Sequence, residues 1–195
     1  MSDASGTLRI LSETLVAVVT RSIWGVRVQG LENVPRSGPL IVACNHASLL
    51  DGPLLGAMIA PRRRPRFLGK KELFANPLLG GFLLGTGVIP LDRGSGDLAA
   101  LRAALGVLSD GGSLVVFPEG TRVKLGERRV PKPGVAFLSA RAGARVLPVR
   151  LKGTAEFPRA FPLTVAFGAP LEPPAQSREA AVEFARSVMD AIYAL

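Results

Sequence analysis

The sequence of 195 residues contains only one cysteine, Cys44, and one histidine, His46. A single cysteine excludes an intrachain disulfide and fits a reducing compartment. Aromatic residues make up only 6% of the chain and are not interleaved with the basic residues, which argues against a nucleic-acid-binding surface. The sequence also lacks internal repeats and low-complexity linkers, so its length favours one domain with a short extension.

Acidic residues are few: 15 Asp and Glu stand against 24 Lys and Arg, which gives a formal net charge of +9. The basic residues are 19 arginines and 5 lysines. An excess of this size predicts an anionic partner. Because nucleic acid is disfavoured by the aromatic content, we expect an anionic membrane surface or a phosphorylated substrate.

The sequence has no convincing secretory signal and no uninterrupted membrane span. Its longest uncharged run, LFANPLLGGFLLGTGVIPL, lies between Glu72 and Asp92 and has the length of a membrane-spanning helix, 19 residues. Pro77, Pro90 and four glycines interrupt this run, so we expect a helix, a turn and a strand with apolar surface available to lipid. We therefore predict a peripheral protein on the cytoplasmic side of the cell membrane.

Residues 1–24 are predicted to form a short amphipathic helix. Apolar residues recur at helical spacing over about four turns. These residues are Leu8, Leu11, Leu15, Val18 and Val19. Two interpretations stay open: the helix packs on the domain core, or it lies on a membrane surface.

Residues 25–195 alternate between strand-like and helix-like segments. The predicted strands are Val26 to Val28, Leu40 to Ala43, Arg66 to Leu68, Val88 to Leu91, Leu114 to Phe117, Val146 to Val149 and Leu163 to Phe167. The predicted helices are Gly52 to Ile59, Glu72 to Leu84, Asp97 to Leu108, Gly134 to Ala142 and Arg178 to Tyr193. This alternation predicts a single α/β domain with a mostly parallel or mixed central sheet flanked by helices.

Three polar loops directly follow three of these strands. They are NHASLLD at 45–51, DRG at 92–94 and PEGTR at 118–122. In α/β sheets, binding sites lie beyond the carboxyl ends of the strands. If the three strands run parallel, the three loops meet at one edge and form a site.

His46 and Asp51 are the candidates for acid–base chemistry. An imidazole can take a proton from a hydroxyl and return it, and a carboxylate on the other ring nitrogen fixes the tautomer. The alternative is a structural histidine that caps the following helix, or one on the surface. The spacing alone leaves both interpretations open.

No protein nucleophile is evident for such a base to activate. A G-x-S-x-G motif is missing, and Cys44 lies in an apolar run where cysteine is usually part of the core. Ser48 is best explained as a turn or cap residue. The simplest inference is that His46 activates a hydroxyl group of the substrate.

Several cations follow the predicted strands. Arg93 and Arg122 come after different strands, and Lys70, Lys71 and Lys132 are expected near the same edge. Two guanidinium groups that face one pocket suit a phosphate monoester, whereas any single arginine is more often ordinary surface charge. No Walker motif or complete dinucleotide fingerprint is present.

Four segments taken in order, NHASLLD, GVIPLDR, FPEGTR and VLPV, resemble the sequence blocks of the glycerolipid acyltransferase family. The similarity runs from about Gly30 to Gly153 and is greatest to bacterial 1-acyl-glycerol-3-phosphate acyltransferases. The first block carries the H-x4-D spacing of His46 and Asp51. The third block continues with Val123 where serine is usual, the second has Pro90 where an aromatic or aliphatic residue is usual, and the region ahead of the first block is short.

The resemblance implies a function and a set of site residues. His46 acts as general base and Asp51 orients it. The substrate-binding residues are Arg93, Glu119, Gly120, Thr121, Arg122 and Lys70. The acceptor is lysophosphatidate or another lysolipid, the donor is acyl-CoA or acyl-carrier protein, and no metal or bound cofactor is required.

Alternatives to transfer onto lysophosphatidate remain. The same chemistry serves another lysophospholipid or a glycolipid as acceptor, and water in place of the acceptor would give a thioesterase. A different class is a non-catalytic peripheral membrane protein that uses its basic surface and its N-terminal helix.

Overall fold

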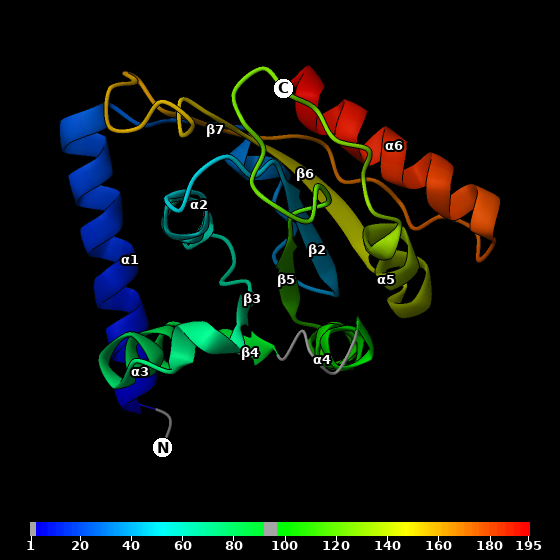
Figure 1. Cartoon of the computed structure of the whole chain (residues 1–195), viewed down its shortest axis with the longest axis horizontal. Coiled ribbons are helices and arrows are strands. Elements are labelled where there is room, and N and C mark those ends of the chain that lie inside the picture. Colours follow the sequence, from blue (N-terminus) through cyan, green and yellow to red (C-terminus); the bar gives the residue numbers. More distant parts are fainter. Residues whose placement is uncertain (1–2, 92–96) are drawn as a thin grey trace.

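A computed structural model describes the backbone of residues 3–91 and 97–195, and their side chains apart from residues 3–5, 91, 97 and 100. Its main sheet has five strands in the order β1-β7-β6-β2-β5 (Figure 1). The strands are β1 (Arg27–Gln29), β2 (Leu40–Cys44), β5 (Ser113–Val116), β6 (Arg145–Lys152) and β7 (Thr164–Phe167). β2 runs parallel to both β5 and β6, whereas β7 is antiparallel to β6. The sheet is therefore mixed, and the predicted fold class is confirmed.

Two of the predicted strands form a separate small sheet. β3 (Phe67–Lys70) and β4 (Val88–Leu91) pair in parallel with each other. One parallel bridge, Arg66 to Leu114, links this pair to β5. Of the three strands that precede the polar loops, β2 and β5 run parallel in the main sheet, whereas β4 pairs only with β3 in the described part of the chain.

Helices cover both faces of the main sheet (Figure 1). They are α1 (Asp3–Trp24), α2 (Asp51–Ile59), α3 (Pro77–Gly85), α4 (Asp97–Ser109), α5 (Gly134–Ala142) and α6 (Arg178–Ala194), with 3-10 turns η1 (Leu31–Asn33) and η2 (Lys71–Phe74). Alternate residues of β2 divide between two cores, since Leu40 and Val42 pack with α2 while Ile41 and Ala43 pack with α4, α5 and α6. Burial on both faces explains why β2 is an unbroken apolar run.

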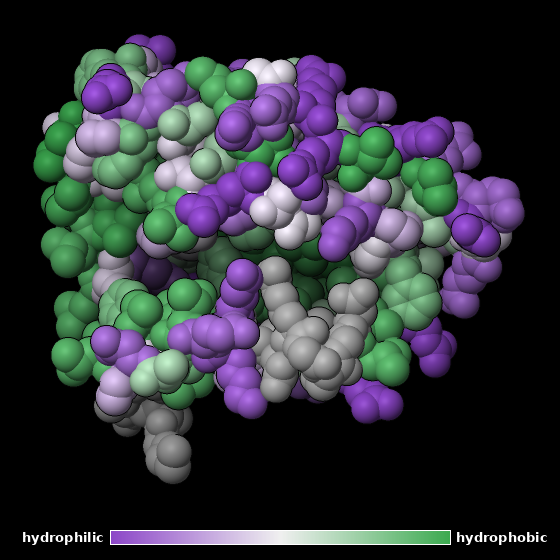
Figure 2. Space-filling view, viewed as in Figure 1, coloured by the Kyte–Doolittle hydropathy of each residue, from purple (hydrophilic) through white to green (hydrophobic). Residues whose placement is uncertain are grey.

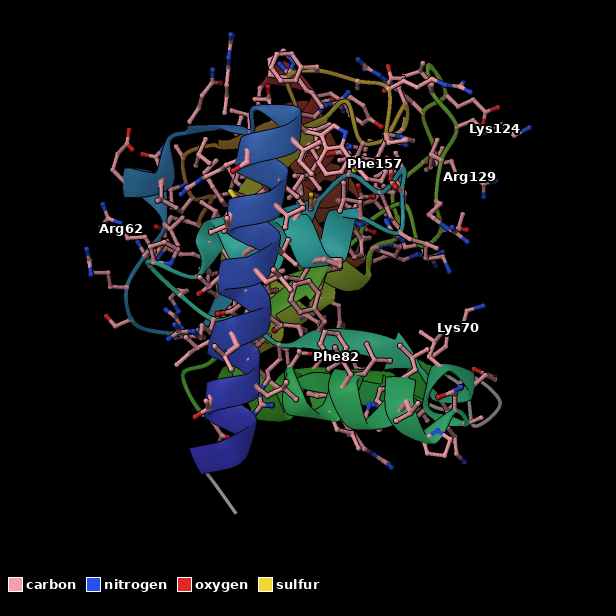
Figure 3. All side chains as sticks on the ribbon, turned by 90° about the vertical axis from the view of Figure 1, so that its left-hand side faces the viewer. Arg62, Lys70, Phe82, Lys124, Arg129 and Phe157 are labelled. Atoms are coloured by element: carbon pink, nitrogen blue, oxygen red, sulfur yellow. The ribbon has the colours of Figure 1, made fainter. Side chains whose placement is uncertain are left out.

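The interpretation that the N-terminal helix packs on the domain core is confirmed for one side of α1, and the membrane-surface interpretation stays a prediction. Val16, Ala17 and Trp24 pack against the core that contains α2. α1 lies at the outside of the molecule (Figure 3), and six of its large apolar residues are exposed. These residues are Leu8, Ile10, Leu11, Leu15, Val18 and Ile23. The structure therefore has a packed helix with an apolar outer face.

The uncharged run after Glu72 forms the predicted helix, turn and strand, but the α-helix begins at Pro77 rather than at Glu72, after the 3-10 turn η2. α3 begins at Pro77, and the Asn76 side chain caps it by accepting the N–H groups of Leu78 and Leu79 at 3.0 and 3.1 Å. Its apolar side chains remain largely outside the core, with Leu78 87% exposed. Figure 2 shows hydrophobic surface over the α1 and α3 side of the molecule. Over residues 3–91 and 97–195, the structure contains no helix with the length and apolarity of a membrane span.

The C-terminal helix α6 matches the prediction, with one exchange in its buried stripe. Ser177 caps it by accepting the N–H of Ala180 at 3.1 Å. Val182 shares the helical spacing of Ala185, Met189 and Ile192, which predicts one apolar stripe, but it is 40% exposed and Val188 is buried instead. Val188 lies one turn before Ile192, on the same side of the helix, whereas Val182 lies near the N-terminal end of α6.

Candidate active site

The His46 side chain is held by a buried carboxylate. His46 lies in the loop after β2, and Asp51 is the first residue of α2, with no exposed surface. The distance from Nδ1 of His46 to Oδ2 of Asp51 is 2.8 Å. An ionised carboxylate only accepts hydrogen bonds, so Nδ1 donates and Nε2 is left as the basic nitrogen. The predicted pairing of these two residues is present in the structure.

The Asp51 carboxylate also shapes the loop that carries the histidine. Its Oδ2 accepts the backbone N–H groups of Ala47 at 2.6 Å and Ser48 at 2.8 Å. These bonds close the loop over the first turn of α2, and they also hold the charge that faces the imidazole. One oxygen therefore fixes both the backbone before the helix and the tautomer of His46.

The imidazole plane is fixed by a second contact. The ring of His46 stacks on that of Phe117 with a centroid distance of 4.1 Å and an interplanar angle of 20°. The side chain keeps 23% of its surface exposed. A ring that is oriented by its neighbours and still open to solvent is suited to proton transfer with a bound substrate.

The backbone of His46 is tied to the third sequence block. Its N–H donates to Oε2 of Glu119 at 2.7 Å, and its carbonyl accepts the N–H of Val123 at 2.8 Å. The other oxygen of Glu119 accepts the hydroxyl of Tyr193 at 2.8 Å. Glu119 is buried, and both of its oxygens have partners within the protein. The structure thus makes Glu119 a support for the histidine loop.

Asn45 provides a further support that the sequence reasoning did not single out. Its side-chain oxygen accepts the N–H of Leu151 at 2.7 Å, and its amide donates to the carbonyl of Leu151 at 3.0 Å. This pair of bonds joins the ends of β2 and β6. The only sequence signal for it is a polar residue at the end of a buried strand.

Cys44 belongs to the core, as predicted. It is fully buried, and its thiol lies on the α2 side of the sheet. Burial, with a smaller contribution from the charges of Asp51 and Glu119, raises the pKa of the Cys44 thiol well above its ordinary value. A protonated and inaccessible thiol does not act as a nucleophile.

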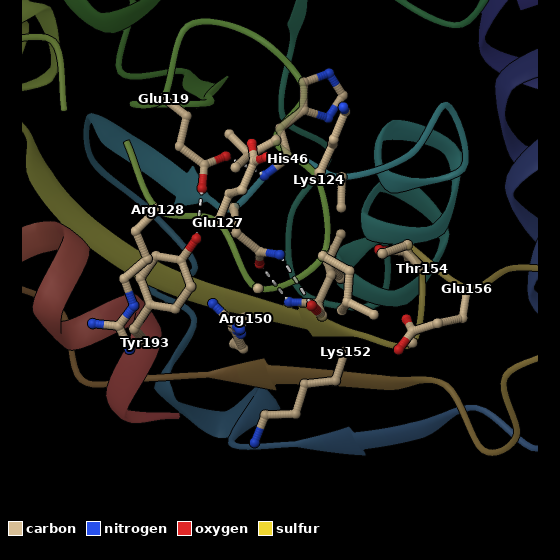
Figure 4. A pocket seen from close by; sticks show the side chains of 18 residues that line it. His46, Glu119, Lys124, Glu127, Arg128, Arg150, Lys152, Thr154, Glu156 and Tyr193 are labelled. Atoms are coloured by element: carbon tan, nitrogen blue, oxygen red, sulfur yellow. Dashed lines mark hydrogen bonds between the residues drawn. The ribbon is translucent and has the colours of Figure 1, made fainter. Parts of the chain in front are cut away.

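A pocket of about 390 Å³ opens beside His46 (Figure 4). It is lined by residues 45–47, 123–128 and 150–156, by Glu119 and by Tyr193 of α6. Its cationic lining residues are Lys124, Arg128, Arg150 and Lys152. This pocket could not be predicted from the sequence, because its walls come from segments far apart in the chain.

A family model described as Acyltransferase matches residues 25–152. The chain belongs to the acyltransferase family. This confirms the family that the four sequence blocks predicted. The match begins directly after α1 and ends with β6, so it contains the whole set of contacts around His46.

Known acyltransferases are similar to this chain in sequence. The 1-acyl-sn-glycerol-3-phosphate acyltransferase of Bacillus subtilis is 31% identical over 130 residues, which cover 66% of this chain and 63% of that protein. The chloroplastic enzyme of that name from Arabidopsis thaliana is 33% identical over 66% of this chain and 36% of its own length. A lyso-ornithine lipid O-acyltransferase of Pseudomonas aeruginosa is 40% identical over 65% of this chain and 46% of that protein. The chain thus spans between about a third and two thirds of the length of these relatives.

A solved acyltransferase has the same fold. The crystal structure of the 1-acyl-sn-glycerophosphate acyltransferase PlsC from Thermotoga maritima aligns with a TM-score of 0.79 at 27% sequence identity. The alignment covers all of this chain and 82% of that one.

Three of the remaining predicted site residues are exposed, and a fourth lies outside the described part of the chain. Arg122 and Thr121 are exposed beside Val123, and Lys70 is exposed at the end of β3. In Figure 3, Lys70 lies on the same side of the molecule as Lys124 and Arg129. Arg93 lies outside the described residues.

Gly120 is required by its backbone conformation. Its φ is 72°, and a Cβ atom at this position would lie 2.7 Å from the Cε atom of Lys132. The N–H of Lys132 in turn donates to the carbonyl of Pro118 at 2.9 Å. Gly120 therefore lets the third block turn tightly behind His46.

Proposed function

We propose that this acyltransferase moves a fatty acyl group from acyl-CoA or acyl-carrier protein to the free hydroxyl of 1-acyl-glycerol 3-phosphate, giving phosphatidate. The observation that carries the proposal is the 2.8 Å contact between His46 Nδ1 and the buried carboxylate of Asp51. Family membership and the names of the similar enzymes support the reaction class and this acceptor.

The histidine acts on the acceptor. Nε2 of His46 takes the proton of the lysolipid hydroxyl while that oxygen attacks the thioester carbonyl. The tetrahedral intermediate collapses, the C–S bond breaks, and the imidazolium returns the proton to the departing thiolate. Asp51 stabilises the imidazolium between these two steps. General base catalysis of this kind typically contributes about 10²- to 10⁴-fold to the rate.

Exposed cations are proposed to bind the phosphate of the acceptor. Arg122 is joined through Val123 to the carbonyl of His46, so its chain position is fixed relative to the base. A guanidinium binds a phosphate with two parallel hydrogen bonds, and Lys70 adds a second charge. Arg93 retains the same predicted role. We expect no metal or cofactor beyond the thioester co-substrate.

The lipid substrate is proposed to reach the enzyme at a membrane surface on the cytoplasmic side. The exposed apolar side chains of α1 and α3 provide a surface for lipid contact, and α1 lies against α3. The net charge of +9 favours an anionic surface. Peripheral binding by both helices would bring the bilayer to one side of the sheet.

A second acceptor is favoured by one observation. Identity to the lyso-ornithine lipid enzyme, 40%, exceeds the 31% and 33% found for the two lysophosphatidate enzymes described above. An ornithine lipid carries no glycerol phosphate. Competition therefore separates the two acceptors: glycerol 3-phosphate should inhibit acylation of lysophosphatidate if Arg122 and Lys70 bind a phosphate.

The proposal is tested by incubating the purified chain with acyl-CoA and each lysolipid in turn and detecting the products by mass spectrometry. Phosphatidate should form, and it should fail to form in the His46→Ala protein. Formation of acylated ornithine lipid alone would replace lysophosphatidate as the acceptor. Equal phosphatidate formation by both proteins would remove His46 from the mechanism.

A further inference from the structure

The pocket beside His46 contains a group that the proposed reaction does not use, the guanidinium of Arg150. Arg150 extends from β6 into the pocket lining. Its Nε and Nη1 atoms are buried and have no hydrogen-bond partner in the described part of the chain. Burying such donors without an acceptor costs free energy, so a structural role alone does not explain them.

A second guanidinium approaches Arg150 across the ring of Tyr193. The guanidinium carbon of Arg150 lies 4.0 Å from the ring centroid, and that of Arg128 lies 4.4 Å from it (Figure 4). Each contact gains some cation–π energy, but two like charges at one ring repel each other. Over the described residues, neither arginine forms an ion pair with a carboxylate. An anion that binds both arginines would relieve this repulsion.

The nearby carboxylate does not serve as that anion. Glu119 accepts the hydroxyl of Tyr193 with one oxygen and the N–H of His46 with the other. Glu127 and Glu156 also line the pocket, and together with Glu119 they leave the four cationic lining residues in excess by one charge. The lining is therefore net positive, and both oxygens of Glu119 already have partners within the protein.

A second polar group of the same pocket is unpartnered. Thr154 is 2% exposed, and its hydroxyl oxygen is buried without a hydrogen-bond partner in the described part of the chain. In Figure 4 it comes from the loop after β6, across the pocket from Tyr193. A hydroxyl can donate to a phosphate oxygen, and the pocket volume of about 390 Å³ is within the range of small-ligand sites.

We propose that this pocket binds a phosphate group of the acyl donor, with Arg150 as the main ligand and Arg128 and Thr154 as further ligands. The inference rests on the proposed function, since acyl-CoA and acyl-carrier protein both carry their thioester on a phosphorylated chain. Lys70 and Arg122, the two described residues that are predicted to bind the acceptor phosphate, do not line this pocket. The donor and acceptor phosphates would then approach His46 from separate sites.

Direct binding tests the inference without relying on turnover. Dissociation constants are measured by isothermal titration calorimetry at constant ionic strength for CoA, inorganic pyrophosphate and glycerol 3-phosphate. Arg150→Gln should weaken CoA and pyrophosphate roughly 10- to 100-fold, because a hydrogen-bonded charge is lost. Glycerol 3-phosphate should bind as it does to the wild type.

Two further variants are controls for misfolding and for long-range charge effects. Thr154→Val removes an unpartnered buried hydroxyl, so it should leave the thermal midpoint unchanged or raise it while weakening pyrophosphate roughly 3- to 10-fold. Arg129→Gln removes one positive charge, as Arg150→Gln does, but from an exposed residue next to Arg128 that does not line the pocket. It should change each dissociation constant less than twofold.

Several results would overturn the inference. Wild-type protein that binds neither CoA nor pyrophosphate would do so, as would unchanged pyrophosphate affinity in both Arg150→Gln and Thr154→Val. Weakened glycerol 3-phosphate binding alone would assign the pocket to the acceptor. Failure of the proposed function shows separately, because wild-type protein would then transfer no acyl group whatever its affinity for pyrophosphate.

Discussion

The Oε2 atom of Glu119 accepts the backbone N–H of His46 at 2.7 Å, although 73 residues separate them in the sequence. Through its other oxygen, the same carboxylate binds Tyr193 of the last helix. The loop of the catalytic candidate is thus joined to the third sequence block and to α6. This network gives the acidic residue of the FPEGTR segment a structural role in holding the histidine loop.

Removing the Glu119 carboxylate should lower stability as well as activity. Glu119→Ala leaves the N–H of His46 and the hydroxyl of Tyr193 unpaired, so we expect the free energy of unfolding to fall by about 2–4 kcal/mol. Urea denaturation measures this change. Glu119→Gln retains an oxygen for the His46 N–H and should lose less, and Glu183→Ala on the exposed side of α6 should change little. Unchanged stability in Glu119→Ala would mean that the carboxylate serves the substrate only.

Asp51→Asn should separate the effect of the carboxylate charge on catalysis from its effect on the geometry of the histidine loop. An amide oxygen can still accept the N–H groups of Ala47 and Ser48, so the fold should persist by circular dichroism. The imidazolium loses its negative partner, and we expect acyl transfer to fall about 10²- to 10⁴-fold. Steady-state kinetics check this, and a variant with nearly wild-type kcat would show that Asp51 has only a structural role.

The Cys44 thiol should be unreactive in the folded protein. Iodoacetamide at pH 8 should modify the native chain about 100-fold more slowly than the urea-unfolded chain, because the buried thiol remains protonated. Rapid modification of the native protein, measured by mass spectrometry, would show that the thiol is accessible.

The same burial makes stability depend on alkaline pH. The folded-state pKa of Cys44 is raised, so its contribution is fully present below the ordinary thiol pKa of about 8.5 and is lost as the pH rises above it. The unfolding free energy should then fall by up to about 1.4 kcal/mol per pH unit from this group. Cys44→Ala is the control, since only the difference between its slope and that of the wild type reports on the thiol.

The apolar surface of α3 should bind lipid. Leu78→Glu combined with Phe82→Glu changes two exposed side chains, so the fold should survive. Each lost apolar contact is worth about 1–2 kcal/mol, and we expect binding to anionic vesicles to weaken at least about tenfold in a sedimentation assay. Val182→Glu on the distant helix α6 is the matched control (Figure 1). Equal binding by the double variant would exclude α3 from the membrane contact.

The central strand could be predicted well from the sequence because one property, burial on both faces of the sheet, determines its composition. Leu40 to Cys44 is buried on both faces, and only a central parallel strand tolerates such an unbroken apolar run. The separation of β3 and β4 from the main sheet was not predictable, because a strand's own pattern does not say which strand is its neighbour. The exposure of Val182 has a similar cause, since helical spacing does not say which part of an apolar stripe the rest of the domain covers.

The pairing of His46 with Asp51 was predictable because both residues belong to one short loop. The roles of Asn45, Glu119 and Tyr193 depend on contacts between segments far apart in the chain, and local spacing carries no signal for them. A role for Arg150 could not be predicted for the same reason. In the sequence it is one residue of a strand, and only the fold brings it beside Tyr193.

The role of His46 as catalytic base is tested most directly by measuring thiol release from acyl-CoA, with and without lysophosphatidate, for the wild-type protein and for His46→Ala. We predict release that requires the acceptor, accompanied by phosphatidate, and a fall of about 100-fold or more in the variant while its circular dichroism stays native. Release without acceptor, together with free fatty acid, would indicate a thioesterase. An equal rate in the variant would contradict the assignment of His46 as the catalytic base.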